Sequence, residues 1–297
     1  MNQPLPLRTE TAFVFQCQGD DLIGVLHSGD PGCDIGVLTI VAGGPQYRGG
    51  VARQLVRLGR RLASVGVPVM RFDHRGLGDS EGEFKGFRFI HDDLLAAIAE
   101  FKSRAPAVRR IILWGGCDSA SAALINAWKL PDVACVIAGN PFVSSPATAS
   151  IVRRKHYLSR LGQASFWVKL LRGQYDIGGY FAAAWRKIVA RLRGGADSGV
   201  SGKVGASGGN GNFIDEILKG LQKFDGKILF LMGDRFLLSD EFDELIVSSS
   251  AWKAAYGKPG YERIDIKGGD QVFSGYESQE RLFDVATRWI QREFQEK

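Results

Sequence analysis

A cysteine at the apex of a glycine-containing turn is the residue of this sequence best placed to do chemistry. The segment LWGGCDS (113–119) follows an apolar run and precedes a segment of helical period. In a sharp turn from strand to helix the apex residue is strained, and small residues are needed two positions before it and two after it. Gly115 and Ser119 meet this need around Cys117. The pattern predicts a nucleophile elbow with cysteine as the nucleophile, and a buried structural cysteine is the alternative.

Segments of strand and helix pattern alternate around this turn. β-rich runs lie at 12–17, 22–27, 35–42, 67–73, 110–115, 133–139, 227–233 and 261–267, and segments of helical period lie at 51–65, 92–103, 119–129, 243–256 and 278–294. The first two runs are joined by QGDD and predict an antiparallel hairpin. The alternation after them predicts an α/β fold with a mostly parallel central sheet and helices on both faces.

One stretch interrupts the alternation. Residues 144–213 have the pattern of amphipathic helices rich in arginine and tryptophan, followed at 194–211 by a run dominated by Gly, Ser and Ala. Such a run buries too little apolar surface to order itself, so we expect a mobile linker there. We expect 144–213 to form a helical lid over the carboxyl edge of the sheet, and 1–143 with 214–297 to form the core.

Four segments make the chain similar to the α/β-hydrolase superfamily almost from end to end. The chain most resembles the exosortase A system-associated hydrolases of the first type, through GGPQYRGG (43–50), RFDHRGLGDSEGE (71–83), LWGGCDSASAAL (113–124) and GGDQVFS (268–274). The resemblance implies an α/β-hydrolase fold and a setting in bacterial exopolysaccharide production and exosortase-linked export. It does not name a substrate.

The resemblance also implies roles for individual residues. In such a fold, backbone N–H groups in the loop after the third strand and directly after the nucleophile hold the oxyanion, which assigns Gly44 and Asp118. Arg75 is expected to pair with a carboxylate in a structural loop. The acid of the triad should follow the run at 227–233, where Asp234 is preferred over Asp240, and a solvated loop carboxylate is the alternative for either.

The histidine that should complete the triad is absent. The related family has approximately G-x-D-H-x-F-S after the last strand, whereas this chain has Gln271 at the histidine position and no histidine after His156. Glutamine can hydrogen-bond a thiol but cannot accept its proton. A cysteine depends less on a base, because a helix N-terminus lowers the pKa of a thiol, although an inward Asp118 carboxylate would oppose this. His156 in the predicted lid is the alternative base.

The net charge of +6 belongs to the predicted lid. Residues 151–205 contain eleven Lys or Arg and two Asp, so this segment carries +9 and the rest of the chain −3. No nucleic-acid-binding module is recognisable. The basic segment suits an anionic small-molecule or carrier-bound acyl or glycan substrate, peripheral contact with a membrane surface, or simply a solvated helical face.

The remaining composition narrows the class of protein. No apolar run is long enough to span a membrane and the N-terminus lacks the pattern of a signal peptide, so we expect a cytoplasmic protein. The four cysteines show neither metal-ligand spacing nor a disulfide framework, and no metal or cofactor is expected.

Two functions fit these patterns. The first is an ester or thioester hydrolase, or an acyltransferase, in which Cys117 attacks the carbonyl carbon. The second is a catalytically weakened hydrolase-like protein that binds an acyl or glycan ligand or a protein partner, and it is motivated by Gln271.

Overall fold

The computed structural model describes residues 9–41, 46–144, 213–234 and 237–295. They belong to one of the two units into which the chain divides, the unit of residues 1–144 and 205–297. The predicted linker, Gly44 and His156 lie outside the described residues, as does the predicted lid apart from its two end residues. Among the described residues, no helix has both the length and the apolar character needed to cross a membrane.

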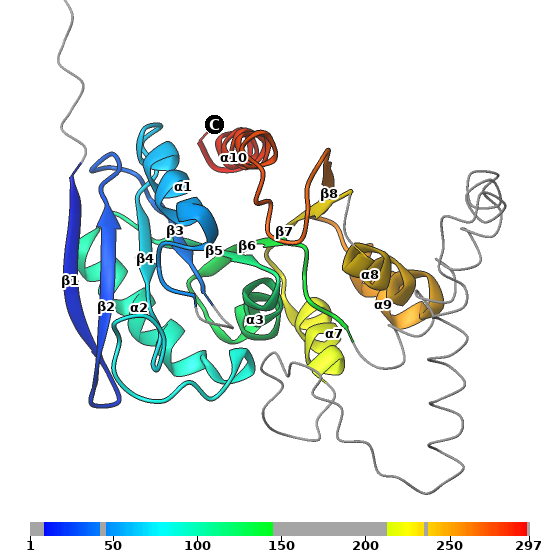
Figure 1. Ribbon diagram of the computed structural model, residues 1–297, viewed down its shortest axis with the longest axis horizontal. Coiled ribbons are helices and arrows are strands. Elements are labelled where there is room, and N and C mark those ends of the chain that lie inside the picture. The colour runs from blue at the N-terminus through cyan, green and yellow to red at the C-terminus, as the bar shows by residue number, and fades with distance from the viewer. Residues whose placement is uncertain (1–8, 42–45, 145–212, 235–236, 296–297) are drawn as a thin grey trace, which may run out of the picture. The chain divides into compact units, whose positions relative to one another are not determined.

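Eight strands form a single sheet in the order β1-β2-β4-β3-β5-β6-β7-β8 (Figure 1). β1 pairs antiparallel with β2 and β2 antiparallel with β4, whereas all later pairs are parallel. The predicted hairpin and the mostly parallel sheet are therefore confirmed. The strands are β1 (Glu10–Cys17), β2 (Asp20–His27), β3 (Ile35–Thr39), β4 (Val69–Phe72), β5 (Arg110–Gly116), β6 (Val133–Gly139), β7 (Lys227–Gly233) and β8 (Tyr261–Ile266).

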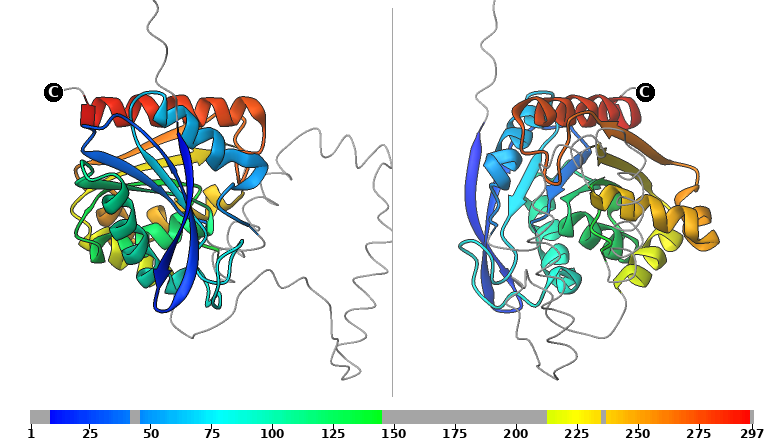
Figure 2. Two further views of the ribbon diagram at one scale, coloured as in Figure 1. Left: turned by 90° about the vertical axis from the view of Figure 1, so that its left-hand side faces the viewer. Right: turned by 45° about the vertical axis from the view of Figure 1, so that its right-hand side comes forward.

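Helices cover both faces of the sheet (Figures 1 and 2). One face carries α1 (Gln54–Ala63) and α10 (Tyr276–Ile290), and the other carries α2 (His91–Arg104), α3 (Asp118–Asn126), α7 (Phe213–Lys223), α8 (Leu237–Ser248) and α9 (Ser250–Tyr256). Short helical turns η1 (Val51–Arg53), η2 (Phe87–Phe89) and η3 (Ala127–Lys129) and the π-helical turn η4 (Gln291–Gln295) complete the described helices.

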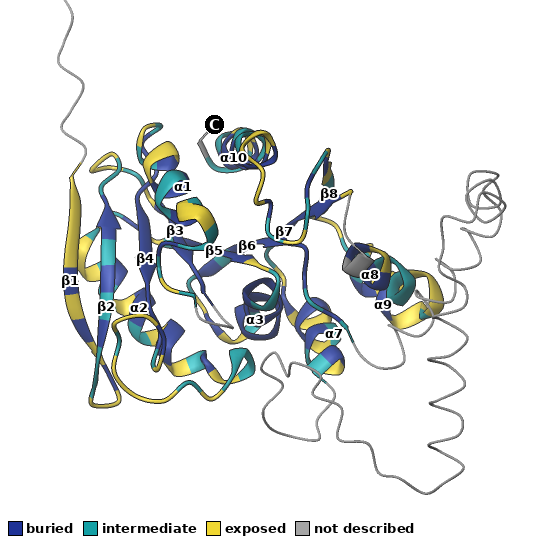
Figure 3. Cartoon of the chain, viewed as in Figure 1, coloured by how far each residue is buried: buried dark blue, intermediate teal, exposed yellow. Residues whose placement is uncertain are grey.

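The apolar core lies in two layers because strand side chains alternate between the faces. In β5, Ile111 and Leu113 join the layer under α2 and α3, and Ile112 and Trp114 join the layer under α1 and α10. Figure 3 shows the central strands and α3 almost entirely buried. The residue that follows β5 is therefore held from both sides by packed structure.

Several predicted helix boundaries were wrong for local reasons. The segment 51–65 is divided into η1 and α1, because Ala52 and Arg53 have positive φ. The segment 243–256 spans α8 and α9, which meet at Ser249, whose hydroxyl accepts a hydrogen bond from the backbone N–H of Trp252 and caps α9. α7 was not predicted, although Ile214, Ile217 and Leu221 lie at helical spacing.

Candidate active site

Cys117 forms the turn between β5 and α3 in a strained backbone conformation. Its φ is 56° and its ψ is −120°, values that cost free energy in any residue other than glycine. Backbone hydrogen bonds hold this conformation: the Cys117 N–H donates to the Gly139 carbonyl at 2.8 Å. The Cys117 carbonyl accepts from the N–H groups of Ala120, Ser121 and Phe142. The turn therefore has the shape predicted for a nucleophile elbow.

Close packing within the turn requires a small residue two positions before Cys117. A Cβ atom at Gly115 would overlap the carbonyl group of Ser119, whereas a Cβ atom at Gly116 would meet nothing within 4 Å. The Ser119 hydroxyl also ties the turn, since it accepts from the Gly116 N–H at 2.9 Å and donates to the Gly116 carbonyl at 2.7 Å. Ser119 therefore supplies both the space and the hydrogen bonds of the turn.

Two side chains flank the sulfur. Gln271 Nε2 donates a hydrogen bond to Cys117 Sγ at 3.3 Å, and the thiol donates to Asp118 Oδ1 at 3.7 Å. Cys117 and Gln271 line a cavity of about 50 Å³, whose wall also includes Trp114, Gln54 and Phe273. The structure thus brings the predicted nucleophile together with the residue predicted at the histidine position, which follows it by 154 positions.

The surroundings of Cys117 keep the thiol protonated. Burial and the Asp118 carboxylate raise its pKa to about 11, and the hydrogen bonds from the Gln271 amide and the Asp118 backbone N–H lower the pKa by less. The helix N-terminus was expected to lower the thiol pKa and an inward Asp118 carboxylate to oppose this, and the raised pKa agrees with the second expectation. The Asp118 side chain turns toward the sulfur, and its negative charge opposes ionisation.

Asn140 positions the loop that carries Gln271. This buried residue follows β6 with a positive φ of 43°. Its Nδ2 donates to the carbonyls of Asp270 and Gln271 at 2.9 and 3.0 Å, and its Oδ1 accepts from the Gly233 N–H at 2.7 Å. Sequence reasoning missed Asn140, although an asparagine directly after an apolar strand was a signal, because asparagine tolerates positive φ.

Hydrogen bonds within the loop that carries Gln271 also stabilise its conformation. The Asp270 carboxylate accepts from the backbone N–H groups of Val272 and Ser274 and from the Ser274 hydroxyl. Gln54 Nε2 donates to the Val272 carbonyl at 3.1 Å, which connects the loop to α1. These bonds satisfy the polar groups of Asp270 locally and leave the Gln271 side chain directed at the sulfur.

The predicted acids have different surroundings. Asp234 is exposed directly after β7, and its Oδ1 accepts from the Gly268 N–H at 2.7 Å, three residues before Gln271. Asp240 is exposed in the first turn of α8. The structure therefore links Asp234 to the Gln271 loop through the backbone. Gly44, the predicted oxyanion donor, and His156, the alternative base, lie outside the described residues.

The loop after β4 is built on ion pairs. The expected carboxylate partner of Arg75 is the buried Asp93, with Nε and Oδ1 3.1 Å apart. Asp73, which is fully buried, pairs with Arg48 and accepts its backbone N–H as well. Arg71 donates to the Arg48 carbonyl at 2.8 Å. These contacts support the structural role expected of this loop and anchor the segment that follows residues 42–45.

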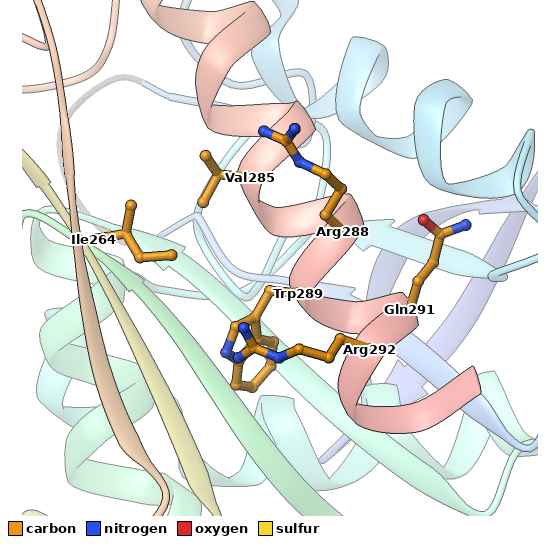
Figure 4. Close-up of a pocket in the computed structure, with 6 residues that line it drawn as sticks. All are labelled: Ile264, Val285, Arg288, Trp289, Gln291 and Arg292. Carbon is orange, nitrogen blue, oxygen red and sulfur yellow. The ribbon is translucent and has the colours of Figure 1, made fainter. Parts of the chain in front are cut away.

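A larger pocket of about 440 Å³ lies between β8 and α10 (Figure 4). Trp289 Nε1 and Arg292 Nη2 both donate to Glu262 there, at 2.8 and 2.5 Å. The pocket is lined by Ile264, Val285, Arg288, Trp289, Gln291 and Arg292. It shares no lining residue with the cavity at Cys117 and presents no nucleophile. The described residues also contain no cluster of three or more His, Cys, Asp or Glu suited to a metal ion.

The comparisons with known proteins found similarity to solved structures only. No family model and no curated protein matches this chain. The esterase Pf2001 of Pyrococcus furiosus is similar over 97% of this chain and 94% of its own, with a TM-score of 0.61 and 18% identity. GrgF, an α/β hydrolase of Penicillium sp. sh18, is similar over 97% and 99%, with a TM-score of 0.60 and 18% identity.

A dienelactone hydrolase of Anabaena variabilis is also similar, over 96% of this chain and 98% of its own, with a TM-score of 0.58 and 12% identity. Likeness at such identities concerns the fold and not the reaction. The strand order, the two helical layers and the strained turn after β5 agree with it. This chain has the α/β-hydrolase fold.

Proposed function

We propose that the protein is an acyl hydrolase or acyltransferase that uses Cys117 as its nucleophile on an ester or thioester. The observation that carries the proposal is the strained turn that presents the Cys117 sulfur to a cavity at the end of β5. Strain of this kind persists where the surrounding structure enforces it, and it gathers at functional sites. The similarity to an esterase and a dienelactone hydrolase supports the same class of reaction.

The reaction proceeds through an acylated cysteine. The sulfur attacks the carbonyl carbon, and the carbonyl oxygen becomes an oxyanion that the backbone N–H groups of Asp118 and Gly44 stabilise. Expulsion of the alcohol or thiol leaves an acyl thioester on Cys117. Water, or a sugar or amine acceptor, then takes the acyl group.

The substrate class follows from charge. The eleven Lys or Arg of residues 151–205 favour an anionic acyl or glycan compound, free or on an acidic carrier, and allow contact with an anionic membrane surface. The resemblance to exosortase-associated hydrolases suggests bacterial exopolysaccharide production as the setting.

A second function is favoured by the same site. Gln271 cannot act as a base, and the thiol with its pKa of about 11 is almost fully protonated at neutral pH. A protein with these properties can bind an acyl or glycan ligand, or a partner, without turning it over. Turnover that depends on Cys117 separates the two functions.

The test uses the full-length chain with p-nitrophenyl esters and acyl thioesters of two to eight carbons. We expect wild type to hydrolyse them and Cys117→Ala to lose nearly all of that activity, with an acyl adduct trapped on the peptide that contains Cys117. Cys33→Ala, which changes a cysteine outside the cavity, is the control. Equal turnover by wild type and Cys117→Ala would contradict the enzymatic proposal.

A further inference from the structure

We propose that the Asp118 carboxylate takes the proton from the Cys117 thiol, so that a cysteine–aspartate pair replaces the missing histidine. This assignment rests on the proposed function. The observation behind it is the pair of opposite hydrogen bonds at the sulfur, which accepts from Gln271 Nε2 at 3.3 Å and donates to Asp118 Oδ1 at 3.7 Å.

The two flanking groups have complementary abilities. A glutamine amide N–H can only donate, so Gln271 stabilises negative charge on the sulfur. An ionised carboxylate can only accept, so Asp118 provides a destination for the thiol proton. The thiol therefore lies between a group that stabilises the thiolate and a group that removes the proton.

Among the residues that the structure describes, His27, His74 and Asp270 make contacts away from the sulfur. His27 accepts a hydrogen bond from Arg71 at 2.7 Å, and His74 is buried with its ring centroid 5.2 Å from that of Phe84. The carboxylate of Asp270 binds within its own loop. The cavity-lining residues within the described part of the chain are uncharged, including Gln46 and Gln54.

Burial makes Asp118 a better base than an exposed carboxylate. Loss of hydration raises the pKa of its carboxyl group, although the hydrogen bond from the thiol lowers it somewhat. The same carboxylate keeps the resting thiol protonated, because its charge raises the thiol pKa. A protonated resting thiol needs a base at the moment of attack, and the Asp118 carboxylate already accepts a hydrogen bond from that thiol.

The step balances without any additional reagent. As the sulfur lone pair forms the S–C bond, the S–H proton moves to Asp118 and the π electrons of the carbonyl move to its oxygen. When the tetrahedral intermediate collapses, the C–O or C–S bond to the leaving group breaks and the leaving group takes the proton from Asp118. In the second half, Asp118 accepts a proton from water as water attacks the thioester, and returns it to the departing sulfur.

Asp118→Asn distinguishes a base from a carboxylate that only raises the thiol pKa by its charge. Loss of a base lowers ester turnover, whereas loss of the charge alone leaves turnover unchanged or raises it. Asparagine keeps the shape of aspartate but carries no charge, so the thiol pKa falls and alkylation of Cys117 by iodoacetamide at pH 7.5 should become several-fold faster. Ester turnover should nevertheless fall by about 10²- to 10⁴-fold, the usual contribution of a positioned base. Asp225→Asn, which changes a carboxylate whose side chain is 97% exposed, is the control.

A second variant keeps the test independent of folding. In Asp118→Ala, added formate should restore part of the turnover, since a small carboxylate can occupy the vacated position. The assignment of Asp118 as the base would be overturned if Asp118→Asn showed faster alkylation with unchanged or faster turnover. It would also be overturned if formate did not rescue Asp118→Ala. Neither result would overturn the proposed function. A wild-type chain without Cys117-dependent turnover would overturn the proposed function and this assignment with it.

Discussion

At the scale of single residues, three side chains determine what the site can do. Cys117 has the strained backbone conformation predicted for a nucleophile, Gln271 donates to its sulfur from the position where the resemblance predicts a base, and Asp118 faces the sulfur. Gln271 and Asp118 would activate a serine at position 117 poorly, because a hydroxyl is far less acidic than a thiol and depends more on a base. A glutamine where the resemblance predicts a histidine is therefore more tolerable if the nucleophile is a cysteine.

Returning a histidine to the site should increase turnover. In Gln271→His, an imidazole replaces the amide that lies 3.3 Å from the sulfur. We expect kcat/KM for short acyl esters to rise by about tenfold or more, with a new rise in activity around pH 6.5, because a positioned base contributes roughly 10²- to 10⁴-fold and histidine titrates near that pH.

Steady-state kinetics from pH 5 to 9 check this prediction. Gln46→His, which places a histidine elsewhere on the wall of the same cavity, is the matched control. If both variants gained equally, the position of Gln271 beside the sulfur would have no special importance for proton transfer.

At the scale of elements, the connection from β5 to α3 depends on the absence of a side chain at Gly115. Gly115→Ala should lower the free energy of unfolding by about 3 kcal/mol or more, because its Cβ overlaps the Ser119 carbonyl and the turn must open. Gly116→Ala should lower it by less than about 1 kcal/mol, since a Cβ there meets nothing within 4 Å. Urea unfolding of the two adjacent variants measures the difference, and similar losses would refute this account of the turn.

The ends of β6 and β7 and the Gln271 loop depend on one amide. Asn140→Ala should lower the free energy of unfolding by about 2 to 4 kcal/mol, because it removes two donors to loop carbonyls and leaves the buried Gly233 N–H without its acceptor. Ser239→Ala removes the hydroxyl that donates to this amide and to the Gly233 carbonyl, and it should cost about 1 kcal/mol. Unfolding curves in urea give both values. If Asn140→Ala lost no more free energy of unfolding than Ser239→Ala, Asn140 would not be what holds the Gln271 loop.

At the scale of the whole molecule, the buried His27 and Arg71 join with Glu10 to connect β1, β2 and β4. His27 in β2 accepts from Arg71 Nε of β4 at 2.7 Å, and its other ring nitrogen lies 3.8 Å from the Glu10 carboxylate of β1. Burial, and to a lesser extent Arg71, lower the pKa of His27 to about 4. The hydrogen bond from Arg71 requires the neutral ring, so this contact favours a deprotonated histidine.

Global stability should therefore fall in mild acid. Unfolded His27 takes up a proton near pH 6.5, whereas the folded residue resists protonation until about pH 4, so the free energy of unfolding decreases as pH falls through this window. The contribution of His27 is on the order of 3 kcal/mol by pH 4. His27→Gln keeps an acceptor for Arg71 but does not titrate, so its stability should change less between pH 7 and pH 4.5. Parallel pH dependence in the two proteins would exclude this role for His27.

Much of the architecture was predictable because it depends on local patterns. Alternating apolar runs and helical periods located the eight strands, and the antiparallel hairpin followed from the turn sequence QGDD. The strained turn at Cys117 was predictable from Gly115 and Ser119, since the need for small neighbours is a property of adjacent residues. Helix ends were less predictable, because positive φ at Ala52 and Arg53 and the cap at Ser249 were weak signals in the sequence.

The sequence by itself thus determined the alternating order of elements, the small residues that allow the tight turn at Cys117 and the absence of histidine after residue 156. Only the tertiary structure decided that Gln271 reaches the sulfur, that Asn140 positions its loop, and that Asp118 turns inward. It also decided that burial and the inward Asp118 carboxylate raise the pKa of the thiol. The physical reason is that hydrogen bonds and charge effects depend on distance in space, and folding brings together residues as much as 154 positions apart.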